Sequence, residues 1–110
     1  MFQSINSIDA AEQFIAENML AFIYVTRENC SVCHGLLPQV EQVLEKYPKV
    51  QSRIINADEV PEFSGQYTVF SVPALLLFVD GKEYIRAARI VPMDQFEGKI
   101  KRIYKLVANA

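Results

Sequence analysis

The chain contains 110 residues, of which 51% are hydrophobic, and carries a formal net charge of −2 at pH 7. This length and composition predict one domain, residues 1–110, with a sizeable core. The mixed acidic and basic residues argue against nucleic-acid or membrane-surface partners, and no apolar run approaches the roughly 20 residues of a membrane span. Because the N-terminus also shows no secretory signal, we expect a cytoplasmic protein.

The first third of the chain predicts two strands around a helix. Residues Phe2 to Ile5 give a weak strand signal, and Ser7 is well placed to cap the helix that follows. The run from Leu20 to Val25 is almost wholly apolar, which is typical of a central strand covered on both faces. A long amphipathic helix should then extend to about Lys46, with a kink at Pro38.

The middle of the chain predicts two further strands and a short helix. Val50 to Ala57 is a strand candidate. Asp58 to Tyr67 is a weak helix, with Pro61 near its start and Gly65 near its end, as helix termini prefer. Ala74 to Val79 gives the strongest strand signal of the chain.

The last third of the chain predicts a hairpin and a final helix. Asp80-Gly81 is a typical hairpin turn, so the segment from Lys82 to Val91 should pair antiparallel with the strand before it. The last helix should follow Pro92, where Asp94 and Glu97 fit a capping box. The resulting order, β-α-β-α-β-α-β-β-α, predicts an α/β domain whose mixed sheet is covered by helices on both faces.

The segment from Asn29 to Pro38 contains both cysteines and the single histidine of the chain. It lies between the apolar strand and the long helix, where free backbone N–H groups and the helix dipole lower the pKa of a thiol. Residues i and i+3 share a helix face, so Cys30 and Cys33 are spaced to form a disulfide. We therefore predict that Cys30 and Cys33 form a disulfide that can be reduced and formed again.

Two simpler interpretations compete with this redox pair. Buried cysteines are often inert core residues. A structural zinc site normally needs four ligands, whereas this chain offers Cys30, Cys33 and the adjoining His34, so that only a dimer could share a site. We therefore predict neither a metal nor a cofactor for the single chain.

A second motif lies about forty residues beyond the cysteines, where Ser71-Val72-Pro73 precedes the strongest strand. Together with the sequence from Asn29 to Cys33 and the helix containing Pro38, this motif resembles the thioredoxin family over nearly the whole chain. The resemblance implies a thioredoxin fold with a central mixed sheet of four to five strands flanked by four helices.

The resemblance also implies roles for individual residues. In that family the first cysteine attacks a target disulfide and the second resolves the mixed disulfide, so Cys30 would be the nucleophile and Cys33 the resolving thiol. The family proline before the strand is cis and faces the sulfurs. Pro73 would therefore follow a cis bond, and Val72 would offer its backbone to an extended substrate segment.

The sequence departs from the usual family motif around the cysteines. Asn29 stands where a tryptophan is usual, and Ser31-Val32 replaces Gly-Pro. Typical members carry a buried aspartate six residues before the first cysteine, whereas this chain has Tyr24. Arg89 occupies the place of a small residue before the last helix, and we expect it to face substrates.

Tyr24 should not replace the missing aspartate as a proton acceptor, because an unperturbed tyrosine has a pKa of about 10. Water and His34 are then the candidates for proton transfer, since an imidazole titrates near neutral pH. We therefore expect slow resolution of the mixed disulfide and weaker turnover than in a housekeeping thioredoxin.

Two functions follow from the resemblance. The first is a thiol-disulfide oxidoreductase that reduces protein disulfides and receives electrons from a thioredoxin reductase or a small thiol. The alternative is a binding module or redox switch on a thioredoxin scaffold, with little turnover. The intact cysteine pair favours the first, and we expect the protein to act as a monomer.

Overall fold

The computed structural model describes residues 2–108. In chain order, their helices and strands are β1 (Gln3–Ile5), α1 (Ile8–Glu17), β2 (Leu20–Thr26), α2 (Ser31–Glu45), β3 (Gln51–Asn56), α3 (Pro61–Gln66), β4 (Ala74–Val79), β5 (Lys82–Ala88) and α4 (Met93–Val107). The strands form one five-stranded sheet in the order β1-β3-β2-β4-β5. β1, β3 and β2 run parallel, while β4 is antiparallel to β2 and β5 is antiparallel to β4. The predicted mixed sheet with four helices is confirmed.

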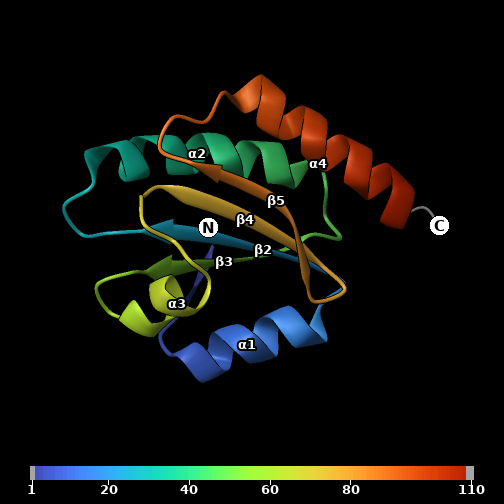
Figure 1. The fold of residues 1–110 in the computed structure, drawn as a ribbon. Coiled ribbons are helices and arrows are strands. Elements are labelled where there is room, and N and C mark those ends of the chain that lie inside the picture. The colour runs from blue at the N-terminus through green and yellow to red at the C-terminus, as the bar shows by residue number, and fades with distance from the viewer. Residues whose placement is uncertain (1, 109–110) are drawn as a thin grey trace.

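The sheet is the middle of three layers, with α1 and α3 on one face and α2 and α4 on the other (Figure 1). β2 lies at its centre, and all of its residues are buried because a helix layer covers each face. Ile23 and Val25 pack on the α1 and α3 side, whereas Phe22 and Tyr24 pack on the α2 and α4 side. The prediction of a doubly covered central strand is confirmed.

Two local sequence signals form the structures that they predict. Ser7 caps α1, because its Oγ accepts a hydrogen bond from the Ala10 N–H over 3.1 Å. Asp80 and Gly81 have φ values of 51° and 81°, as the central residues of a type I′ hairpin turn require. Pro38 lies inside α2 as expected, and the kink there stays a prediction.

The strand expected from Lys82 to Val91 is too long by three residues. β5 ends at Ala88 because Arg89 has a φ of 68°, in the left-handed region where a strand cannot continue. The Arg89 N–H donates instead to the carbonyl of Pro73 over 2.9 Å. This bond ties the loop before α4 to the loop before β4.

The capping box predicted for the last helix is wrong. α4 begins at Met93 with Pro92 as its N-cap, so Asp94 already lies inside the helix. The Glu97 carboxylate lies 3.1 Å from Lys46 Nζ just beyond the end of α2 and does not return to its own helix terminus. An ion pair between helices has replaced the local cap that the sequence pattern favoured.

The short helix also ends differently from the prediction. α3 covers only Pro61–Gln66, and Gly65 lies within it. The left-handed residue after the helix is Thr68, with a φ of 57°. The N–H of Val69 then donates to the carbonyl of Ser64 over 2.9 Å, a pattern that commonly closes helix ends. A threonine therefore occupies a backbone conformation that glycine adopts more easily.

Candidate active site

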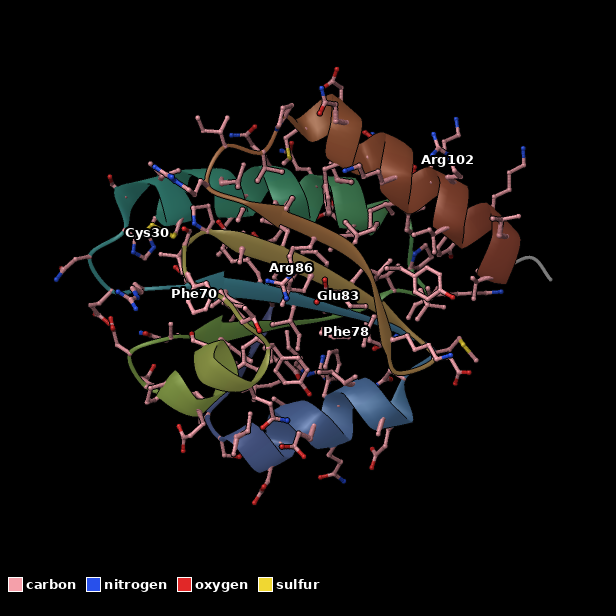
Figure 2. All side chains as sticks on the ribbon, in the orientation of Figure 1. Cys30, Phe70, Phe78, Glu83, Arg86 and Arg102 are labelled. Atoms are coloured by element: carbon pink, nitrogen blue, oxygen red, sulfur yellow. A yellow bond between two sulfur atoms is a disulfide. The ribbon has the colours of Figure 1, made fainter. Side chains whose placement is uncertain are left out.

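The candidate site lies where the central strand β2 leads into α2. Residues 27–29 form the short connection, and Cys30 is the N-cap residue of α2. Cys30 and Cys33 are joined by a disulfide, with their Cα atoms 5.2 Å apart. Figure 2 shows Cys30 at the beginning of α2, at one end of the molecule. The predicted pairing of the two cysteines at a strand-to-helix turn is confirmed.

The two sulfurs differ in exposure. Cys33 is fully buried in the core on the α2 and α4 side, whereas Cys30 is only partly buried. The N–H of Cys33 donates to Cys30 Sγ over 3.2 Å, and the positive end of the α2 dipole lies at the same place. In the reduced protein both would favour a negative charge on Cys30. Cys30 is therefore the sulfur that an approaching molecule meets first.

A groove of about 680 Å³ opens beside Cys30. Four segments contribute to its lining: the start of α2 with Cys30 and Val32, Asp58 after β3, Val72 and Pro73 before β4, and Arg89 and Ile90 before α4. The Val72–Pro73 peptide bond is cis, the isomer that the resemblance implies. Four residues predicted for the site, from three separate segments, therefore line one groove.

Two strongly exposed apolar side chains line this groove among polar and charged residues such as Arg27 and Asp58. They are Val32, 61% exposed, and Ile90, 89% exposed, while Phe70, two residues before Val72, is 86% exposed. Large exposed apolar side chains at a groove are candidates for contact with a partner. Sequence reasoning named Val32 only as a departure from the family motif and did not name Phe70 or Ile90 as site residues, although a phenylalanine in a predicted loop was a visible signal. We call Val32, Phe70 and Ile90 the apolar rim.

Tyr24 lies on β2 beneath the first turn of α2. Its side chain is fully buried, and its hydroxyl donates to the carbonyl oxygen of Cys33 over 2.6 Å. Burial raises the pKa of Tyr24 above its ordinary value, so the hydroxyl keeps its proton at neutral pH. A hydrogen-bond donor therefore stands where the typical family members carry a carboxylate. It anchors the backbone of Cys33 and does not act as a base.

His34 is not part of the groove lining. Its side chain is exposed, and Nε2 lies 3.2 Å from the carbonyl oxygen of Glu28. An imidazole donates a proton from Nε2 in such a bond. The structure therefore ties His34 to the connection between β2 and α2, one residue beyond the buried Cys33.

Two other kinds of site were sought in the described part of the chain. Among residues 2–108, no group of three His, Cys, Asp or Glu side chains is arranged to hold a metal ion. Within the same residues, no helix has the length and apolar character needed to cross a membrane.

Comparison with known proteins identifies relatives over most of the chain. The family described as Thioredoxin matches residues 5–102. The thioredoxin-like protein YdfQ of Bacillus subtilis strain 168 is 46% identical over 102 residues, which cover 93% of this chain and 91% of the relative. The thioredoxin of Chlamydia trachomatis is 35% identical over 75 residues, which cover 68% of this chain and 74% of the relative.

Solved structures show the same architecture. A mutant thioredoxin from Halobacterium salinarum NRC-1 superposes with a TM-score of 0.84 at 23% identity, covering 96% of this chain and 92% of that one. The thioredoxin of Trypanosoma brucei brucei also gives a TM-score of 0.84, at 18% identity, with the same coverage of both chains. The expected thioredoxin fold is confirmed.

The buried hydrogen bond of Tyr24 should contribute measurably to stability. Tyr24→Phe removes the hydroxyl that donates to Cys33 and keeps the packed ring, so we expect the free energy of unfolding to fall by about 1 kcal/mol. Tyr84→Phe is a matched control, because Tyr84 is 61% exposed on β5. Urea unfolding of the oxidised proteins measures both changes, and equal effects would contradict the assigned role of the Tyr24 hydroxyl.

Proposed function

This chain belongs to the thioredoxin family and is a thiol-disulfide oxidoreductase, and within that activity we propose that it reduces protein disulfides through Cys30 and Cys33. The observation that carries this proposal is the difference between the two sulfurs. One is partly exposed beside a groove and accepts a backbone N–H, and the other is fully buried behind it. Such a pair is suited to two successive steps, attack on a substrate disulfide by the exposed sulfur and then closure of the internal disulfide by the buried one.

The proposed reaction begins with both cysteines reduced. The Cys30 thiolate attacks one sulfur of the substrate disulfide, so a mixed disulfide forms and the first substrate sulfur leaves as a thiolate that takes up a proton. The Cys33 thiol then loses its proton and attacks Cys30 Sγ. This second step closes the Cys30–Cys33 disulfide, releases the other substrate sulfur and transfers two electrons in total to the substrate.

The groove supplies the proposed contacts with the substrate. An extended segment lies along the backbone of Val72 beside Pro73, where main-chain hydrogen bonds give affinity with little dependence on sequence. The guanidinium of Arg89 on the groove wall interacts with acidic groups of the substrate and, before the attack, with the negative charge of the Cys30 thiolate. His34 and water are the proposed proton carriers for the resolving step.

The proposed reaction also needs an electron donor, a class of substrates and a location in the cell. A thioredoxin reductase or a small thiol returns two electrons to the Cys30–Cys33 disulfide after each turnover, because each reduction of a substrate leaves this pair oxidised. The substrates are disulfide-containing proteins. We place the protein in the cytoplasm, as a single domain of residues 1–110 that acts as a monomer, without a metal or cofactor.

One observation favours a second candidate function, a redox switch or binding module with little turnover. Tyr24 offers no base beneath Cys33, so the mixed disulfide formed by Cys30 would be released slowly. A protein that holds its partner for a long time behaves as a binding module. Steady-state reduction of insulin by dithiothreitol with catalytic amounts of the protein separates the two, since only an oxidoreductase with turnover accelerates it.

The roles of the two cysteines can be tested separately. Cys30→Ser should abolish disulfide reduction, because the buried Cys33 does not reach a protein substrate. Cys33→Ser should attack but not release, and should accumulate mixed disulfides that mass spectrometry detects. If Cys30→Ser traps partners and Cys33→Ser does not, the two assignments are reversed.

The missing base can be restored by substitution. Tyr24→Asp places a carboxylate beneath Cys33, so we expect release of the mixed disulfide to become faster by up to about a hundredfold. Tyr24→Asn is the matched control, since it has the same size but accepts no proton. Stopped-flow kinetics with a peptide disulfide resolve attack from release. Equal release rates for the two variants, or release already as fast as attack in the unmodified protein, would eliminate the proposed bottleneck.

The effect of the Arg89 charge and the effect of its left-handed backbone conformation can be measured separately. Arg89→Gln removes the charge, so the thiolate fraction of Cys30 at neutral pH should fall by roughly twofold to fivefold, as measured by alkylation rates. Arg89→Gly should do the same and also raise stability by about 1 kcal/mol, because glycine tolerates the positive φ. Arg102→Gln is the control, since Arg102 is exposed on α4 far from Cys30 (Figure 2). An alkylation rate unchanged in Arg89→Gln would refute the electrostatic role.

A further inference from the structure

The side chain of Arg86 on β5 makes a group of contacts that the redox reaction does not use. Its guanidinium donates to both carboxylate oxygens of Glu83, from Nε over 2.9 Å and from Nη2 over 2.7 Å. It also donates to the carbonyl oxygens of Thr68 over 2.9 Å and of Tyr67 over 2.6 Å. A planar guanidinium suits such simultaneous contacts, which a lysine could not reproduce.

These contacts join β5 to the segment that follows α3. Arg86 is paired with Leu76 of β4 in the sheet, and Leu76 packs in the core on the α1 and α3 side. Tyr67, whose carbonyl it binds, packs its ring edge-on against Phe78 of β4, with centroids 5.6 Å apart. Figure 2 shows Arg86 next to Glu83, with Phe70 on the side toward Cys30.

The segment from Tyr67 to Pro73 is thereby fixed at several points. Arg86 binds its first two carbonyls, the buried Val69 donates to the carbonyl of Ser64, and the Pro73 carbonyl accepts the Arg89 N–H. Thr68 has a φ of 57°, a conformation that costs free energy for a residue other than glycine. A charged hydrogen bond to its carbonyl stabilises that conformation.

Phe70 lies in the middle of this fixed segment and is 86% exposed. A surface phenylalanine on a well-anchored segment exposes apolar area that a partner can cover at little cost in conformational entropy. The other members of the apolar rim, Val32 and Ile90, line the groove beside Cys30. Phe70 is two residues before Val72 and lies on the side of Arg86 toward Cys30 (Figure 2), so a segment that extends along Val72 beyond the groove would have Phe70 within reach.

We propose that Arg86 is a positioning residue for substrate selection, which holds the segment from Tyr67 to Pro73 so that Phe70 contacts an apolar side chain next to the attacked cysteine of a protein substrate. This inference rests on the proposed reduction of protein disulfides. It adds a preference among substrates, which the cysteine chemistry alone does not supply. Glu83 orients the guanidinium, and the hydrogen bond from Arg86 lowers the pKa of the Glu83 carboxyl, which therefore stays ionised near neutral pH.

The test compares three substrates that differ in whether they can make an apolar contact with Phe70. Two are peptide disulfides that are identical except for leucine or serine beside the reactive cysteine, and the third is hydroxyethyl disulfide, which is too small to reach Phe70. The variants are Phe70→Ala, Arg86→Met, their double mutant and the control Arg102→Met. Arg102→Met makes the same substitution at an arginine that is exposed on α4, far from Cys30 (Figure 2).

We expect Phe70→Ala and Arg86→Met each to lower kcat/KM for the leucine peptide by about tenfold, mainly through KM. For the serine peptide and for hydroxyethyl disulfide, kcat/KM should change by less than about twofold, as it should for every substrate with Arg102→Met. For the leucine peptide, the double mutant should have about the same kcat/KM as the poorer single mutant, because both substitutions remove the same contact, the one made by Phe70. Melting temperatures, measured in parallel, identify variants that are not folded during the assay.

Several results would overturn this inference. If Arg86 has only a structural role, Arg86→Met should lower the melting temperature and change kcat/KM equally for all three substrates, or leave KM unchanged. Strictly multiplicative effects in the double mutant would show that Arg86 does not act through Phe70. If the unmodified protein reduces hydroxyethyl disulfide but neither peptide, the proposed function fails and the inference fails with it. If it reduces both peptides and the variants do not alter the leucine preference, the inference alone fails.

Discussion

The placement of Cys33 is the constraint on which the site depends. Its side chain is fully buried, its N–H donates to Cys30 Sγ, and its carbonyl accepts the Tyr24 hydroxyl. The first turn of α2 is thus tied to the central strand of the sheet, the element least able to move because helices cover both of its faces. One sulfur therefore lies within the core and the other beside the groove, and the proposed order of attack by Cys30 and closure by Cys33 rests on this difference.

Tyr24 is suited to anchor the backbone of Cys33 and is not suited to accept a proton. A buried carboxylate in its place would have to be desolvated, and it would accept a proton readily because burial raises its pKa. The tyrosine ring fills the same region of the core with apolar surface and leaves only its hydroxyl to be satisfied, which the Cys33 carbonyl does. The Tyr24 hydroxyl therefore holds the backbone of Cys33 and does not accept a proton, so in the proposed resolving step the proton of Cys33 passes to solvent or to a group outside the core.

The sequence predicted the parts of the molecule that local pattern determines. β2 and β4 are continuous apolar runs, the Asp80-Gly81 turn needs residues that tolerate positive φ, and the two cysteines have helical spacing. It did not predict that Glu97 would bind Lys46, or that Arg86 would bind the carbonyls of Tyr67 and Thr68. Those partners are far apart in sequence, and no local rule connects them. The apolar rim was missed for the same reason, since its members come from three separate segments.

The edge strand β5 connects the two non-glycine residues that have positive φ near the groove. Arg86 binds the carbonyl of Thr68, and Arg89, immediately after the strand, donates its N–H to Pro73. Each hydrogen bond offsets part of the cost of a left-handed residue. The bond from Arg89 joins two segments that line the groove, and the bond from Arg86 holds the segment that leads to them. In this chain α2 and β2 determine where the two sulfurs lie, while hydrogen bonds from β5 and the residue after it, at one edge of the sheet, hold part of the groove wall beside Cys30.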